Sequence, residues 1–186
     1  MDAAERLITS TQELLWERGY VGTSPKAIQQ RAGAGQGSMY HHFTGKPDLA
    51  RAAIDRSATE LRALAEEKFA GPGSAYDRIA AYLRRDRDVL RGCRVGRLTQ
   101  DPDVVANPEL REPLEETLSW LRGRISGLIA EGVAAGEFRP ELVPDDVAAA
   151  LVAVVQGGYV LARSADDPAL FTRAVEGALT LLGGRR

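Results

Sequence analysis

The sequence contains one cysteine, two histidines and no unbroken apolar run longer than VAAALVAVV at residues 147–155. The single cysteine, Cys93, excludes an internal disulfide and fits a reducing compartment. The apolar run is far shorter than the roughly 20 residues that a membrane-spanning helix needs. The N-terminal residues MDAAERLITS also lack the basic start and apolar block of a signal peptide. We therefore expect a cytoplasmic protein without a membrane partner.

The sequence has no segment with the alternating or β-branched pattern of a strand. Apolar residues recur instead at intervals of three and four almost throughout, as in helices with one buried face. Capping signals, such as Asp2 with Glu5 and Ser24 before Pro25, mark expected helix starts. The pattern predicts an all-α fold of about nine helices, most of them at residues 2–19, 25–32, 36–43, 46–69, 74–90, 113–135, 145–163 and 168–182, with residues 91–112 irregular or in short helices.

Acidic residues are missing from Arg18 to Pro47, although acids make up 26 of the 186 residues. The same segment contains the basic residues Arg18, Lys26, Arg31 and Lys46. An acid-free segment with several cations, on a chain of net charge −2, is typical of a surface that meets phosphate. Chance and ordinary loop composition are the alternative explanation.

This segment includes GQGSMYHHF, residues 35–43, with both histidines of the chain. His41 and His42 are adjacent, so on a helix their side chains diverge by about 100°. Zinc sites favour histidines four residues apart or a nearby Cys, Asp or Glu. Catalysis by histidine needs an orienting acid and a nucleophile, and Ser38 has no acid near it in the sequence. The motif therefore predicts neither a metal site nor a catalytic site.

A helix-turn-helix explains the segment better, since the second and third expected helices are short and joined by the glycine-containing turn AGAG. Met39 and Phe43 share one face of the third helix. We expect this face to pack toward Ile28 and Leu15, which leaves the opposite face of the helix free to meet a partner.

The outward face of the third helix is expected to contact DNA. Gln36 projects from the N-terminal end, where major-groove readers place their base contacts. Gly37 has no side chain and lets the helix backbone approach closely, and Ser38 and His41 lie on the same side. Tyr40 flanks the packing face with a phenol suited to a phosphate.

Lys46 stands at the start of a helix, where a cation is unfavourable because that end carries about +0.5 charge. The position is explained if an anion arrives there, since the free N–H groups and Lys46 would then hold one phosphate together. Ser24 and Lys26 have the same arrangement at the start of the second helix. A simply solvated Lys46 is the alternative.

Residues 19–49, GYVGTSPKAIQQRAGAGQGSMYHHFTGKPDL, resemble the DNA-binding domain of tetracycline-repressor (TetR/AcrR-type) regulators. The family pattern is matched without a gap by Gly22, Thr23, Ser24, Ile28, Ala32-Gly33, Gly37, Tyr40, His42-Phe43, Lys46 and Leu49. The resemblance implies an N-terminal three-helix helix-turn-helix domain, a C-terminal ligand-sensing bundle and a homodimer. The residues that it places on DNA are Thr23, Lys26, Gln36, Gly37, Tyr40, His41 and Lys46.

The segment departs from the family pattern at four positions. Ala34 and Gly35 replace the usual Val-Ser, which removes the capping hydroxyl of the third helix at a cost of a few tenths of a kcal/mol. Gln29 stands where the family usually has Ala, and Gln36 where a Lys is common. We therefore expect an operator unlike that of members closer to the pattern.

The last two expected helices are apolar on more than one side, and Gly157-Gly158 allows close helix approach. They fit the four-helix dimer interface that the family uses, with a purely internal core as the alternative. The residues expected at the interface are Leu151, Val155, Gly158, Val175, Leu179 and Leu182.

An effector pocket needs an apolar cavity with a few polar groups. The larger aromatic residues of the second part of the chain, with nearby polar partners, suit such a pocket, although each aromatic also suits an ordinary core. The candidates are Tyr82, Arg94, Trp120, Gln156 and Tyr159. Cys93 is expected to be a small buried apolar residue rather than a redox sensor.

Together these features predict a DNA-binding domain at residues 1–46 and a ligand-binding and dimerisation domain at residues 47–186. The expected function is a transcriptional regulator, most simply a repressor that a small molecule releases from a palindromic double-stranded DNA operator. It needs no cofactor and no catalytic residue. A helical ligand-binding protein with a non-functional DNA reader is one alternative. A small helical enzyme is another, but the sequence shows no catalytic triad, metal set or phosphate loop for it.

Overall fold

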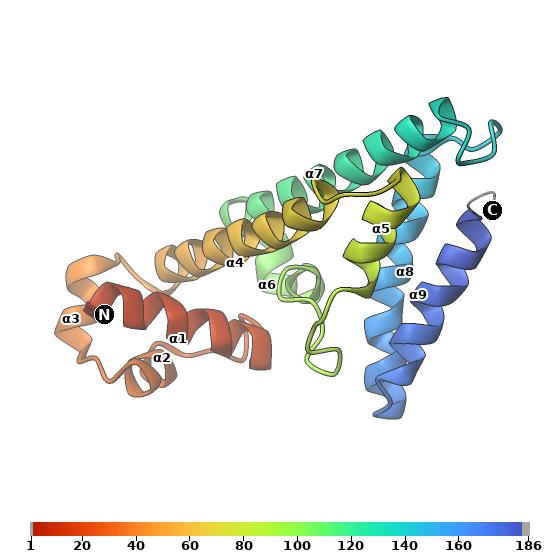
Figure 1. Ribbon diagram of the computed structural model, residues 1–186. Helices are drawn as coiled ribbons and strands as arrows, with labels where there is room; N and C mark the ends of the chain where they lie inside the picture. Colours follow the sequence, from red (N-terminus) through yellow and green to blue (C-terminus); the bar gives the residue numbers. More distant parts are fainter. Residues whose placement is uncertain (1, 184–186) are drawn as a thin grey trace. The chain divides into compact units, whose positions relative to one another are not determined.

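The computed structural model describes residues 2–183, and in this range every regular element is a helix (Figure 1). The predicted all-α class is therefore confirmed. The chain forms two compact units. The first combines the residues up to Glu60 with Cys93–Thr117, and the second combines Leu61–Gly92 with the residues from Leu118 onward. The functional division at residues 46 and 47 stays a prediction.

The first three helices of the first unit are α1 (Ala3–Arg18), α2 (Pro25–Ala32) and α3 (Gln36–His42). Their ends follow from local sequence. The Asp2 side chain accepts a hydrogen bond from the Glu5 N–H at 2.8 Å and begins α1. Ser24 caps α2, with Pro25 at its first position, and Gly33 ends it in the left-handed conformation at φ 58°.

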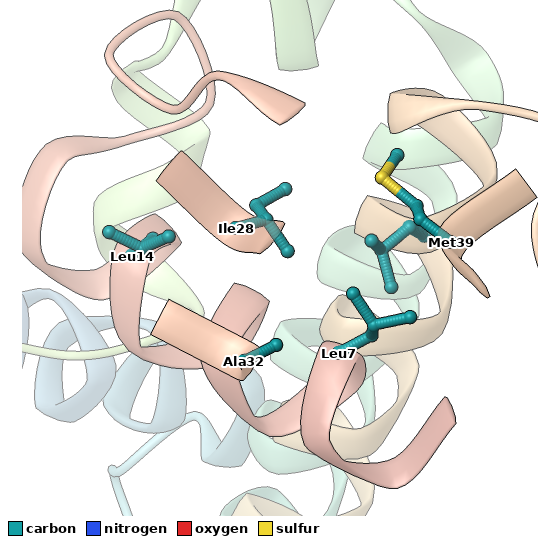
Figure 2. Packing of buried hydrophobic residues seen from close by; sticks show 6 residues of the cluster. Leu7, Leu14, Ile28, Ala32 and Met39 are labelled. Carbon is teal, nitrogen blue, oxygen red and sulfur yellow. The ribbon is translucent and has the colours of Figure 1, made fainter. Parts of the chain in front are cut away.

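Six buried apolar side chains join these helices to α4 (Lys46–Phe69): Leu7, Leu14, Ile28, Ala32, Met39 and Leu49. Figure 2 shows the labelled members pointing toward one another from α1, α2 and α3. Met39 is fully buried, so its side chain contributes about 1.5–3 kcal/mol to stability. Phe43 packs against the cluster, as expected. The α1 members are Leu7 and Leu14, which are two helical turns apart on one face, and the expected Leu15 is not among them.

Helix α5 (Ala75–Arg84) begins at a capping box between Ser74 and Asp77 and ends six residues earlier than the sequence predicted. The guanidinium of Arg87 binds the helix at this end. It donates hydrogen bonds to the carbonyl oxygens of Tyr82 at 2.7 Å and Leu83 at 3.0 Å. The Tyr82 carbonyl also accepts the Arg85 N–H at 3.4 Å, so backbone and side chain together satisfy carbonyls of the last turn.

Residues 91–112 contain the short 3-10 helix η1 (Gly96–Gln100), the short α6 (Pro102–Ala106) and the beginning of α7 (Pro108–Ala134). The sequence placed the start of α7 at Pro113, and that was wrong. Proline has no N–H, so within a helix it leaves the carbonyl four residues earlier without its bond. Here that carbonyl belongs to Glu109, and it accepts a hydrogen bond from the Arg51 guanidinium at 2.7 Å. Arg51 thus allows Pro113 inside the helix.

The second unit ends in α8 (Pro144–Ala165) and α9 (Ala169–Leu182), which lie side by side (Figure 1). Within residues 2–183, α8 is the one helix long and apolar enough to cross a bilayer by length and composition. Core helices of soluble proteins pass the same test. Only 33% of its most apolar window is buried, however, so much of its apolar surface is uncovered in a single chain.

Candidate DNA-binding, dimerisation and effector sites

The two faces of α3 differ sharply in solvent exposure. Met39 is fully buried in the cluster beneath the helix, whereas Gln36, Gly37 and His41 are exposed on the other side. Tyr40 is 51% exposed, and its phenol is available to a partner. A Cβ atom on Gly37 would meet no atom within 4 Å, so nothing of this chain covers that position. The N-terminal end of the helix is therefore exposed and can approach another surface closely.

The predicted DNA-contacting residues around the start of α2 differ in exposure. Ser24 and Lys26 are exposed, and the Ser24 hydroxyl oxygen accepts a hydrogen bond from the N–H of Ala27 at 3.2 Å. Thr23 is only 1% exposed, and its hydroxyl donates to the carbonyl oxygen of Gly19 at 2.7 Å. The side chain of Thr23 thus holds the turn between α1 and α2, whereas Lys26 is free to meet an anion.

Lys46, the first residue of α4, is partly buried, and its ammonium lies 3.9 Å from the centroid of the Tyr20 ring. Such a contact is a cation–π interaction. Burial lowers the pKa of Lys46, while the charges of Asp101 and Asp103 oppose that shift. The cation is therefore held in a defined place at the helix start instead of extending into solvent.

The acid-free segment of the sequence is not free of acids in space. Glu17 forms an ion pair with Arg31 at 2.8 Å. The carboxylate of Asp101 accepts hydrogen bonds from the backbone N–H groups of Tyr20 at 2.7 Å and Val21 at 3.1 Å. Sequence analysis missed Asp101, although an aspartate followed by Pro102 is a usual helix start and α6 begins there.

The two histidines lie on the exposed side of α3 and its end, with ring centroids 4.9 Å apart in an edge-to-face arrangement. Within residues 2–183, no three His, Cys, Asp or Glu side chains are grouped so that they could hold a metal ion. Cys93 is half-buried instead of fully buried, and its sulfur accepts the Gly96 N–H at 3.3 Å.

Two of the predicted effector residues meet in the core of the second unit. Tyr82 and Tyr159 are 2% and 6% exposed, and the Arg87 guanidinium connects them by donating to the Tyr82 carbonyl and, at 3.4 Å, to the Tyr159 hydroxyl. The same guanidinium lies 4.9 Å from the centroid of the Phe171 ring. The Arg85 guanidinium lies 5.4 Å from the centroid of the Tyr82 ring, so this core combines aromatic surface with two cations.

The other three effector candidates are placed differently. Trp120 and Gln156 are half-buried in the second unit. Arg94 belongs to the first unit, where it forms an ion pair with Glu13 at 2.7 Å and lies 4.3 Å from the centroid of the Trp16 ring. The structure thus gives Arg94 partners within the first unit, and the pocket itself stays a prediction.

An apolar groove of about 500 Å³ runs along α8 and α9, and Arg173 is its one charged lining residue within the described chain. Gly157 and Gly177 are exposed in it, and a Cβ atom on either would meet nothing within 4 Å. Leu181 is 79% exposed and Leu161 is 51% exposed at the groove. A contiguous apolar surface of this kind is typical of an interaction site, for another protein, a membrane or a ligand.

The six predicted interface residues divide between this groove and the interior of the second unit. Leu151, Gly158 and Leu182 line the groove. Val155, Val175 and Leu179 do not line it, but all six are buried: Leu151 and Leu182 are 4% exposed, the same as Val155. Hence the interface role of all six stays a prediction, and the exposed groove residues are the better candidates.

A short helix with a buried underside and an exposed polar end, preceded by a second short helix and a tight turn, defines a helix-turn-helix regulator. Comparisons with known proteins agree. Residues 1–53 match the family described as bacterial regulatory proteins, tetR family, and residues 73–178 match the tetracyclin repressor-like C-terminal domain. The chain belongs to the TetR family of transcriptional regulators. Regulators of this family are in general not enzymes.

Individual relatives and solved structures are similar over most of the chain. The transcriptional regulator AcuR of Cereibacter sphaeroides is 28% identical over 168 residues, which cover 87% of this chain and 76% of AcuR. The transcriptional repressor NemR of Escherichia coli is 27% identical over 130 residues, 69% of this chain and 64% of NemR. The crystal structure of a TetR regulatory protein from Rhodobacter sphaeroides has a TM-score of 0.85 at 27% identity, covering 96% of this chain and 97% of that one.

Proposed function

We propose that this protein is a ligand-responsive repressor. In this proposal a cytoplasmic homodimer binds a palindromic operator and leaves it when a small molecule binds the C-terminal bundle. The observation that carries the proposal is the division of α3 into the buried Met39 and the exposed Gln36 and Gly37. A helix that is fixed from beneath and open at its N-terminal end has the form of a major-groove reader.

In this proposal Gln36, Gly37, Ser38 and His41 lie in the major groove. The phosphates are held by Tyr40, Lys46, Ser24 and Lys26, all at least partly exposed. Thr23 has an indirect role: its hydroxyl donates to the Gly19 carbonyl oxygen and so holds the turn between α1 and α2. Phosphate contacts fix the position of the protein, and contacts to base edges select the sequence.

The dimer is proposed to form through the groove on α8 and α9 of each chain. Two copies would cover the apolar surface that one chain leaves exposed, with Gly157 and Gly177 allowing the helices to approach closely. Pairing two copies of the same surface gives a two-fold dimer. A two-fold dimer presents its two reading helices to half-sites about one helical turn, or about 34–36 Å, apart.

The effector is proposed to bind in the C-terminal bundle, near the aromatic core of Tyr82, Tyr159 and Phe171. The support is the mixed character of that core, where the Arg87 guanidinium lies 4.9 Å and 5.8 Å from the centroids of the Phe171 and Tyr82 rings and donates to the Tyr159 hydroxyl. Small-molecule sites usually combine apolar walls with a few fixed polar groups.

A gel-shift experiment with fragments of the source genome tests the DNA-binding step. We expect a subset of fragments to be retarded at low salt and fewer as salt rises, since phosphate contacts release counterions. If the protein retards no fragment at any salt concentration while its helical circular dichroism is intact, the chain is a ligand-binding bundle with a non-functional reader.

A further inference from the structure

The carboxylate of Asp101 is bound at two places in the first unit. One oxygen accepts the N–H groups of Asp103 at 3.2 Å and Val104 at 3.4 Å, and so caps α6. The other accepts the N–H groups of Tyr20 at 2.7 Å and Val21 at 3.1 Å. Hydrogen bonds to an ionised acceptor are about twice as strong as neutral ones. One side chain therefore ties the start of α6 to the turn between α1 and α2.

The turn is shaped to receive this carboxylate. Gly19 ends α1 at φ 74°, a conformation that favours glycine. A Cβ atom on Gly19 would lie 2.8 Å from the Asp101 oxygen, so a side chain there would displace it. Four residues later, Thr23 bonds back to the Gly19 carbonyl, and Ser24 then begins α2. The carboxylate thus fixes the backbone that sets where α2 starts.

The residue that Asp101 holds also supports Lys46. The backbone N–H of Tyr20 binds the carboxylate, while its ring lies beneath the Lys46 ammonium at 3.9 Å. Tyr20 is 9% exposed, so its ring has little freedom to move by itself. A shift of the turn would therefore move the ring and the cation together.

We propose that Asp101 is a positioning residue of the DNA reader, which keeps the turn at Tyr20 in place and thereby holds Lys46 ready for a phosphate. The proposal rests on the proposed phosphate contact of Lys46. Asp101 does not touch DNA in it. Its function is to fix, from a segment about 80 residues away along the chain, both the start of α2 and the cation at the start of α4.

The direction of the change in DNA affinity distinguishes a positioning role of Asp101 from a purely electrostatic one. Asp101 is an anion beside a phosphate-binding cation, so by electrostatics alone its neutralisation should strengthen DNA binding. If Asp101 positions the reader, its neutralisation should instead weaken DNA binding. Asp103 is the matched control, because its charge also acts on Lys46 and Tyr20. Its exposed side chain makes no hydrogen bond to the turn within the described residues.

The test compares Asp101→Asn and Asp103→Asn in the full-length protein. The probe is a labelled duplex that the wild-type protein has selected from a random pool. An asparagine has one oxygen in place of two, so it cannot keep both the cap and the turn. We expect Asp101→Asn to bind about five- to tenfold more weakly than the wild type. Asp103→Asn should bind equally well or more tightly.

Amide hydrogen exchange in the free protein provides a readout that needs no DNA. The amides of Tyr20 and Val21 should lose protection in Asp101→Asn and keep it in Asp103→Asn. Should the wild type select no duplex, the proposed function fails, while this exchange result still tests the turn. Equal or tighter binding by Asp101→Asn, with both amides still protected, would overturn the inference.

A second variant covers the case in which Asp101→Asn fails to fold. Tyr20→Leu removes the ring beneath Lys46 but keeps the backbone bonds to Asp101. We expect weaker DNA binding, and little further loss when Lys46→Ala is added, because both changes remove the same contact. Fully additive losses would show that Tyr20 does not position Lys46.

Discussion

A Cβ atom on Gly158 would lie 2.9 Å from Cδ2 of Phe171, so α8 and α9 touch at this point with no room for a methyl group. The neighbouring Gly157 is exposed in the apolar groove and would meet nothing within 4 Å. The two adjacent glycines therefore have different roles. Gly158 lets the two helices of one chain pack, and Gly157 leaves room for something outside that chain.

Gly158→Ala should lower the free energy of unfolding by about 1–3 kcal/mol, because the added methyl overpacks the contact with Phe171. Urea unfolding followed by circular dichroism measures the loss. Gly157→Ala serves as the paired variant and should not disturb the packing of its own chain. A Gly158→Ala protein as stable as the wild type would show that α9 can yield at this contact.

Gly157→Arg or Gly177→Arg should yield a folded monomer. Each places a charge in the groove that we propose the second copy covers, while leaving the interior of its own chain untouched. Light scattering at micromolar concentration gives the mass, and circular dichroism checks the fold. Gly127→Arg is the control, since Gly127 is an exposed glycine with open space on α7, and it should remain dimeric.

Leu179→Arg is expected to behave differently from the groove variants, because Leu179 is 1% exposed within its own unit. Burying an unpaired charge there should unfold or aggregate the chain. A wild-type protein that is monomeric at micromolar concentration would contradict the proposed dimer altogether.

Lys46→Ala should weaken binding to all DNA sequences by about the same factor, since the residue is proposed to contact phosphate. The slope of log affinity against log salt concentration should become shallower by about one unit. Titrations of one duplex at several salt concentrations measure this. If the substitution changed which sequence is preferred, Lys46 would be a base reader instead.

The three-helix domain could be predicted from sequence because its determinants are local. Ser24 and Pro25 begin α2, Gly33 ends it, and Met39 and Phe43 mark the buried face of α3 by their spacing alone. The end of α5 and the start of α7 were not predicted. In α7, Pro113 lies inside the helix and the freed Glu109 carbonyl is bound by Arg51, which is 58 residues away and so outside any local pattern. At the end of α5, Arg87 binds carbonyls only four and five residues away, but no spacing rule marks it as their partner.

The residues of the functional sites also differ in whether local sequence predicts them. The residues of α3 follow from a local pattern, whereas Asp101 binds a turn about 80 residues away, which no spacing rule reveals. Apolar periodicity in α8 and α9 likewise identifies residues that need burial. It does not distinguish Leu179, which its own chain buries, from Leu181, which is 79% exposed.

In the proposed function, α3 enters the major groove with Gln36 and Gly37 foremost. The most direct test is selection from a pool of random duplexes with the wild type, Gln36→Ala and Gly37→Leu, with circular dichroism of all three. The wild type should select a near-palindrome. Gln36→Ala should lose discrimination of about 1–3 kcal/mol at one position in each half-site, where an adenine is the expected partner. Gly37→Leu should keep its helical spectrum, because that position is open, and fail to bind. The same motif and affinity from all three proteins would mean that this helix does not enter the groove.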